Sequence, residues 1–234
     1  MHKRIIKFLP LLILIGLFIA FYYFKLYRYL NFQTLQNHRQ LWMNWRLQYR
    51  LQVTLIFITG YIIFVAVSLP NAVFLTLLGG FLFGPWLGTF YVVVSASIGG
   101  SILFLAAKTA LHDFLSKKSN AWVHKFKDGF NRHKTSYLLF LRLIPIFPFW
   151  LINIIPAFFK VPLWTFVWTT FIGIIPGSLV YAFLGNSLNV ILAKGEQPNL
   201  NIIFHPFIIL PLIGFALLSL VPIIYKKVSN HENN

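Results

Sequence analysis

Apolar residues gather in long blocks along the chain, separated by short stretches that are rich in basic residues, Pro and Gly. The blocks cover residues 8–24, 51–107, 137–184 and 202–225. About 20 apolar residues, each rising about 1.5 Å along a helix, are needed to cross the hydrocarbon core of a bilayer, which is about 30 Å thick. The pattern therefore predicts an all-α membrane protein, a helical bundle that crosses the bilayer several times.

The first block follows a basic start and is either a signal peptide or a membrane helix. We favour the helix, because the block ends in aromatic residues and Lys25 and no small-x-small cleavage pattern follows it. Residues 25–50 then interleave basic residues with Leu, Trp42 and Trp45. This composition favours a helix that lies on the membrane surface, with a solvated connector as the alternative.

Helix-breaking residues divide the second and third blocks unevenly. Residues 71–78 form an apolar piece between a proline and a glycine pair, too short to cross the bilayer. Such a piece suits one arm of a re-entrant hairpin, and we expect a span over 87–107 after it. Residues 137–159 carry an arginine and three prolines, which predicts a second hairpin. We expect a span over 162–184 to follow it.

Lys and Arg are concentrated between residues 108 and 134, which is typical of a cytoplasmic loop. We expect the protein in the cell (inner or plasma) membrane. With this loop in the cytoplasm, both termini are expected to be cytoplasmic and residues 25–50 to lie on the outer side. The two hairpin-plus-span units then enter from opposite sides, which is the layout of an inverted repeat. We divide the chain into an N-terminal part (1–50), a core (51–188) and a C-terminal span with a basic tail (189–234).

Composition removes several function classes. Hydrophobic residues make up 58% of the chain and charged residues 10%, too few to coat a water-soluble protein. There is no cysteine, the histidines lie at no metal-ligand spacing and the four acids form no pair, so we expect no metal, no cofactor and no enzyme activity. In a membrane protein, the net charge of +16 favours anionic lipid headgroups as partners over nucleic acid.

Arg142 is the first candidate for function. A guanidinium in a membrane segment costs about 2.5–3.5 kcal/mol on insertion scales, so it usually has a partner. No Asp or Glu lies in a predicted span, which leaves backbone carbonyls, water or the phosphate of a lipid or other organic anion. The alternative is that the Arg142 side chain extends to the inner membrane interface.

The remaining candidates are residues of the hairpins and one lysine at the end of a span. Asn153 lines a polar path or bonds a nearby backbone carbonyl. Close helix packing and a tight turn explain the glycines more simply than a ligand-binding role does. A role as interface anchor is the simplest explanation of the lysine. The full set is Asn153, Pro145, Pro148, Gly79, Gly80, Gly84 and Lys108.

Three motifs occur in order in the core: Gly-Gly-Phe-Leu-Phe-Gly at 79–84, Leu-Arg-Leu-Ile-Pro-Ile-Phe-Pro at 141–148 and Gly-Ile-Ile-Pro-Gly at 173–177. Together with residues 97–108, they resemble the bacterial branch of the VTT-domain family, the SNARE-associated, DedA-like multi-pass membrane proteins. The resemblance covers about residues 50–188. It implies two opposed re-entrant hairpins, each followed by a tilted span, and a role in moving lipids between leaflets.

The resemblance also implies functional positions, with two departures. The family arginines map to Arg142 and, at the end of an F-x-x-x-R element, to Lys108, where Lys cannot make the bidentate contacts of Arg. The membrane carboxylates of DedA members are absent, which argues against proton coupling. The leading hypothesis is therefore an uncoupled scramblase or flippase for phospholipids or lipid carriers in membrane homeostasis. A small-solute or ion transporter and a non-transporting membrane scaffold are the alternatives.

Overall fold

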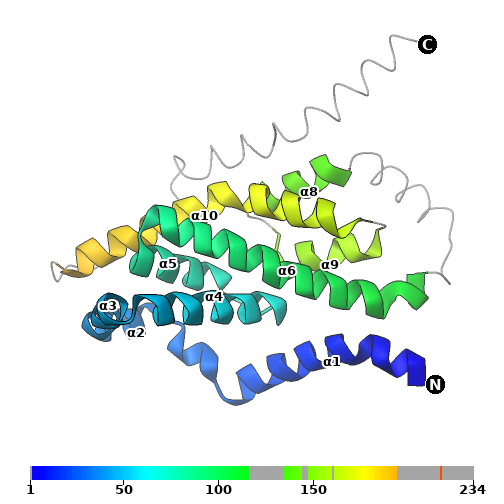
Figure 1. The fold of residues 1–234 in the computed structure, drawn as a ribbon, viewed down its shortest axis with the longest axis horizontal. Coiled ribbons are helices and arrows are strands. Elements are labelled where there is room, and N and C mark those ends of the chain that lie inside the picture. The colour runs from blue at the N-terminus through cyan, green and yellow to red at the C-terminus, as the bar shows by residue number, and fades with distance from the viewer. Residues whose placement is uncertain (1, 116–133, 144–146, 160, 194–216, 218–234) are drawn as a thin grey trace, which may run out of the picture.

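A computed structural model describes residues 2–115, 134–143, 147–159, 161–193 and 217, and every regular element in these ranges is a helix (Figure 1). Two of these helices are long and apolar enough to cross a bilayer, so the expected all-α membrane protein is confirmed. The elements are α1 (His2–Tyr23), the 3₁₀ helix η1 (Leu26–Tyr29), α2 (Phe32–Asn37), α3 (Arg39–Gln48), α4 (Arg50–Ala66), α5 (Ala72–Phe83), α6 (Pro85–Leu115), α8 (Lys134–Leu143), α9 (Phe149–Phe158) and α10 (Leu163–Ala193).

The two helices of membrane-crossing length are α6 and α10. Their apolar stretches run over Pro85–Ala110 and Leu163–Leu192, which confirms the spans expected at 87–107 and 162–184 and lengthens both. At about 1.5 Å per residue, each stretch exceeds the hydrocarbon thickness of about 30 Å. The two helices pack against each other through the middle of the molecule (Figure 1).

The first pair of shorter helices, α4 and α5, is joined by a turn at residues 67–71. Ser68 and Asn71 have positive φ angles of 63° and 68°, and this left-handed backbone breaks the helix. α5 extends beyond the expected piece 71–78, because the glycine pair at 79–80 is helical. The helix ends instead at Gly84, whose φ of 80° is accessible to glycine without strain.

The second pair, α8 and α9, is broken where the sequence carries prolines. Pro148 has a φ of −57° and a ψ of 132° and directly precedes α9. Pro156 lies near the other end of α9, which finishes two residues later at Phe158. Pro145 lies outside the described residues. Two short helices therefore lie at Lys134–Leu143 and Phe149–Phe158, and the re-entrant hairpin expected in this block stays a prediction.

The shorter helices pack on the two long ones. α4 and α9 pack on α6, α8 packs on α10, and α5 packs on both α10 and α6. Each short pair therefore contacts both long helices. The contact between α5 and α10 is close, since a Cβ added at Gly80 would lie 2.0 Å from the carbonyl oxygen of Ala182. The order of elements is the same in both halves, and an inverted relation between them stays a prediction.

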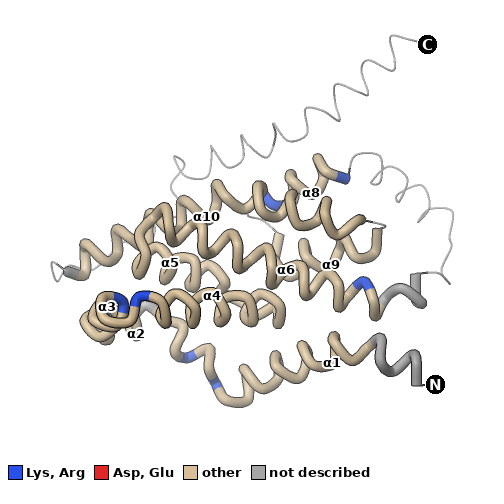
Figure 2. Tube along the Cα trace, viewed as in Figure 1, with Lys and Arg blue, Asp and Glu red and all other residues tan. Residues whose placement is uncertain are grey.

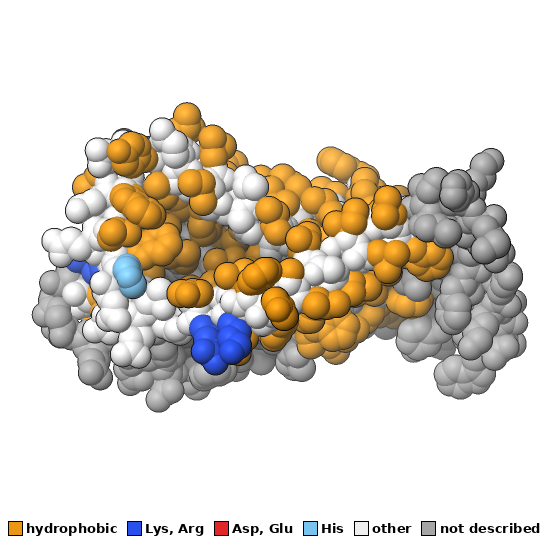
Figure 3. Space-filling view, turned by 90° about the horizontal axis from the view of Figure 1, so that it is seen from below, with side chains coloured by type: hydrophobic (Ala, Val, Ile, Leu, Met, Phe, Trp, Pro, Cys, Tyr) orange, Lys and Arg blue, Asp and Glu red, His pale blue; other side chains and the backbone are white. Residues whose placement is uncertain are grey.

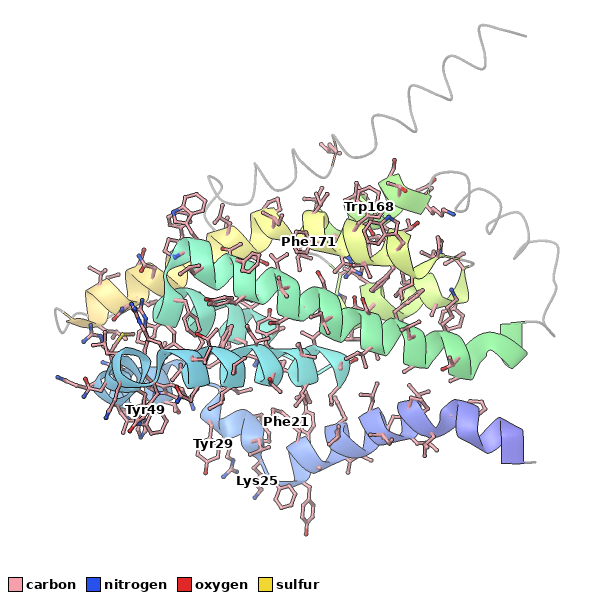
Figure 4. All side chains as sticks on the ribbon, in the orientation of Figure 1. Phe21, Lys25, Tyr29, Tyr49, Trp168 and Phe171 are labelled. Atoms are coloured by element: carbon pink, nitrogen blue, oxygen red, sulfur yellow. The ribbon has the colours of Figure 1, made fainter. Side chains whose placement is uncertain are left out.

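The N-terminal helices pack against α4, α6 and α10. Phe21 of α1 points toward α4, where its ring meets that of Phe64 edge to face at 6.0 Å (Figure 4). α3 meets α4 at 115°, and these two helices make a third span only if they are counted together. Arg39 Nε of α3 donates to Asn189 Oδ1 of α10 at 3.0 Å. The last expected span, 202–225, lies almost entirely outside the described residues.

The outer surface of the described helices is largely apolar. Figure 3 shows hydrophobic side chains over most of the described part of one face, with basic side chains on the side of η1 and α3. Lys and Arg gather at η1, α3 and the start of α4, and no Asp or Glu appears among the residues whose side chains are described (Figure 2). Exposed apolar surface of this extent fits contact with lipid.

Candidate functional site

A buried arginine lies where α8, α9 and α10 meet. Arg142 belongs to the last turn of α8 and is only 8% exposed. Its side chain passes Gly173 of α10, where an added Cβ would lie 2.7 Å from Arg142 Cβ. The glycine therefore allows α8 and α10 to approach closely enough to bury the guanidinium.

Asn153 of α9 is the hydrogen-bond partner of this arginine. Arg142 Nη1 donates to Asn153 Oδ1 at 2.8 Å, and Asn153 is fully buried. Gly100 of α6 borders the same amide, because a Cβ added there would lie 3.1 Å from Asn153 Oδ1. The structure thus brings two sequence candidates, Arg142 and Asn153, together against the two long helices.

Two aromatic rings flank the guanidinium. Arg142 Cζ lies 4.9 Å from the ring centroid of Phe166 in α10 and 5.5 Å from that of Phe149 in α9. Such cation–π contacts contribute about 0.5–2 kcal/mol each. Sequence reasoning named neither ring as a site residue. Phe149 directly follows the motif around Arg142, whereas no local signal marks Phe166.

Three hydrogen-bond donors of the Arg142–Asn153 pair have no partner. They are Arg142 Nε, Arg142 Nη2 and Asn153 Nδ2, and all three are buried. The part of the chain whose side chains are described contains no Asp or Glu that would pair with them (Figure 2). A buried cation without a counter-ion is costly, and an oxyanion offsets that cost. Guanidinium and amide donors match the oxygens of a phosphate or carboxylate.

Lys108 of α6 is connected to the same site through aromatic rings. Its Nζ donates to the carbonyl oxygen of Val161 at 2.8 Å and lies 5.3 Å from the ring centroid of Phe104. Phe104 stacks on Phe166, with 4.4 Å between centroids and 12° between planes. The anchor expected at this position is therefore also a neighbour of the rings that contact Arg142.

The face of α6 that carries these contacts is partly polar. Ser97, Gly100, Phe104 and Lys108 follow each other at intervals of three or four residues, so they share one face of the helix. Ser97 Oγ is buried without a partner. Ser101 Oγ donates to the Ser97 carbonyl oxygen at 2.6 Å. An unpaired hydroxyl therefore lies one turn before the glycine that borders Asn153.

The glycine candidates make their contacts elsewhere in the bundle. Gly79 packs against side chains of α4 and α6, Gly80 packs against the backbone of α10, and Gly84 ends α5. Pro148 precedes α9 and so determines where the helix that carries Asn153 begins. No group of three or more His, Cys, Asp or Glu that would suit a metal ion lies within the described residues.

Comparison with known proteins places this site inside a shared region. The family profile of the VTT domain matches residues 69–187, which include Arg142. The chain is 32% identical over 173 residues to the Transmembrane protein 41 homolog of Caenorhabditis elegans, covering 73% of this chain and 68% of that protein. It is 31% identical over 180 residues to Transmembrane protein 41B of Homo sapiens and of Rattus norvegicus, covering 75% of this chain and 60% of each relative.

The chain therefore spans about three fifths to two thirds of the length of these curated relatives. No solved structure matches it.

Proposed function

The chain belongs to the VTT-domain family of membrane proteins, and from this premise we propose that it moves a phospholipid or lipid carrier between the leaflets of the cell membrane. The supporting observation is the buried guanidinium of Arg142, which has two unpartnered donors and Asn153 beside it. Charged groups inside membrane segments usually mark a transport path. Lipid phosphates are the oxyanions that are most concentrated next to such a protein.

Each residue has a distinct part in the proposed path. Arg142 binds the lipid phosphate through Nε and Nη2, whose fork geometry matches two phosphate oxygens. Asn153 holds Nη1 in place and presents Nδ2 to the same anion. Lys108, near the end of the α6 span, attracts the anionic headgroup. The acyl chains stay in the bilayer, and transport runs without a carboxylate that carries protons.

The first test measures scrambling by the purified chain in liposomes with a fluorescent phospholipid in both leaflets. Dithionite quenches only the outer leaflet, so about half of the fluorescence stays protected unless lipids exchange. We expect wild type to lose the protected fraction and Arg142→Ala to slow this loss about tenfold, because a charge-assisted hydrogen bond is worth about 1.5–3 kcal/mol. Arg28→Ala, which changes an exposed arginine of η1, is the matched control and keeps the wild-type rate.

A protected fraction of about half with folded wild-type protein contradicts scrambling of that lipid. A small organic anion is the second candidate for transport, because the free Nε and Nη2 donors of Arg142 can bind the oxygens of any oxyanion. Uptake of a radiolabelled organic phosphate into the same vesicles, with Arg142→Ala beside wild type, distinguishes the two functions.

A further inference from the structure

The two cations of the candidate site share one pair of stacked rings. Lys108 Nζ lies over the ring of Phe104 at 5.3 Å, and Arg142 Cζ lies over the ring of Phe166 at 4.9 Å. The rings stack on each other at 4.4 Å. Each cation therefore lies over one ring of the stacked pair. Lys108, Phe104, Phe166 and Arg142 therefore form a continuous ladder across α6, α10 and α8.

This stacked geometry has a physical reason. Ring faces are electron-rich and repel each other, so aromatic pairs often meet edge to face, as Phe83 and Tyr91 do here at 90°. A cation over each ring draws electron density toward itself and reduces the repulsion between the stacked faces. Phe104 and Phe166 are both fully buried, so water does not weaken the contact between the two rings.

Each cation of the ladder keeps donors for a ligand. The Lys108 ammonium has three N–H groups, and the hydrogen bond to the Val161 carbonyl uses one of them. Arg142 keeps Nε and Nη2 unpartnered. Lys108 is partly exposed, whereas Arg142 is buried. The two stacked rings thus lie between a partly exposed cation, Lys108, and a buried one, Arg142.

We propose that the stacked rings of Phe104 and Phe166 are positioning residues that hold Lys108 and Arg142 as the outer and inner stations of one phosphate path. The rings orient the guanidinium so that its unpartnered donors face the anion, and they keep the two cations apart. The role of this path in lipid transport rests on the proposed function, whereas the phosphate site and the positioning are tested without transport.

Binding of sn-glycerol 3-phosphate tests both stations. The full chain with ¹⁵N-labelled arginine is placed in phosphatidylcholine nanodiscs, and the Arg142 guanidinium signal is identified by its loss in Arg142→Lys. In wild type the ring current of Phe166 shifts this signal and glycerol phosphate shifts it further. Phe166→Leu removes the contribution of Phe166 to the ring-current shift and weakens binding about threefold or more, and Phe166→Tyr preserves both. Lys108→Ala weakens binding about threefold or more but keeps the ring-current shift.

Matched controls are Phe183→Leu, an exposed phenylalanine of α10, and Lys25→Ala, an exposed lysine beside η1 (Figure 4). Both keep the wild-type signal and affinity. Phe104→Leu is the second variant, since it breaks the stack without contacting Arg142, and it weakens binding in the same direction as Phe166→Leu. Wild-type affinity for glycerol phosphate in Phe166→Leu or Phe104→Leu overturns the positioning role. Wild-type affinity for glycerol phosphate in Lys108→Ala overturns the role of Lys108 as the outer station. If glycerol phosphate does not shift the Arg142 signal of wild type, the proposed phosphate path is overturned.

The scrambling assay separates this inference from the proposed function. If glycerol phosphate binds as expected and wild type does not scramble lipid, the phosphate path stands and lipid transport fails. If wild type scrambles lipid, and Phe166→Leu and Lys108→Ala match it in rate and in glycerol phosphate binding, the inference fails and lipid transport stands.

Discussion

Arg142 is held by an amide and not by a carboxylate, so no residue whose side chain is described compensates its charge. Asn153 has the shape of aspartate without its charge. A buried ion pair would be the ordinary way to satisfy this guanidinium, and its absence leaves donors open for a passing anion. At this position the requirements of stability and of transport are therefore opposed.

Asn153→Asp is expected to stabilise the fold and to block transport. The new carboxylate pairs with Arg142 at the existing 2.8 Å contact and occupies the cation that the phosphate needs. We expect the thermal midpoint in detergent to rise by about 2–4 °C for each kcal/mol gained, and the scrambling rate to fall about tenfold. Asn153→Ala, the control, lowers both quantities. An Asn153→Asp variant with full activity would show that the transported phosphate does not need this guanidinium.

At the scale of elements, the contact between α5 and α10 is made by backbone against backbone. A Cβ at Gly80 would lie 2.0 Å from the Ala182 carbonyl oxygen, and one at Gly185 would lie 2.0 Å from the Leu77 carbonyl oxygen. Each helix thus contributes one glycine to the contact. Lipid is as apolar as leucine, so close packing of this kind, and not hydrophobic burial, holds membrane helices together.

Gly80→Ala is therefore expected to force α5 and α10 apart. Overpacking of a tight contact costs about 1–3 kcal/mol, and we expect the thermal midpoint in detergent to fall accordingly. Gly60→Ala in α4 is the matched control, because a Cβ there has nothing within 4 Å and alanine favours a helix by about 1 kcal/mol. Equal thermal midpoints in the two variants would contradict the backbone contact.

At the scale of the whole molecule, most of the basic residues lie in two groups. One group lies at η1, α3 and the start of α4, and the sequence carries another between 108 and 134. The α3 and α4 members of the first group flank the 115° bend between these two helices. This bend fits a segment on the membrane surface, and the side of the membrane on which each group lies stays a prediction from charge.

Cysteine labelling tests this topology, because the chain has no cysteine of its own. We expect Gln48→Cys, at the exposed end of α3, to react with a membrane-impermeant maleimide in intact cells. Ser119→Cys is expected to react only after the membrane is opened, since the surrounding Lys and Arg favour the cytoplasmic side. The reverse pattern contradicts the predicted orientation, and the unsubstituted chain measures background labelling.

Local sequence patterns were enough to predict the class of protein and most of the places where its helices break. Hydrophobic length and helix breakers act locally, so the spans at α6 and α10 and the break before Pro148 follow from short stretches of chain. A charge among apolar residues is equally local, and it marked Arg142. The end of α5 was predicted too early, at residue 78, whereas the helix runs to Phe83. A glycine pair weakens an isolated helix, but here it allows the close packing of α5 on α10 and stays helical.

The residues that surround Arg142 could be identified only from the packed helices. Phe166 and Gly173 lie on α10, Gly100 and Phe104 lie on α6, and each meets the site through packing between helices that are distant in sequence. Nothing in the local pattern separates a phenylalanine that faces lipid from one that stacks beneath a guanidinium. That choice depends on helix rotation and crossing, which are properties of the packed bundle and not of any single segment.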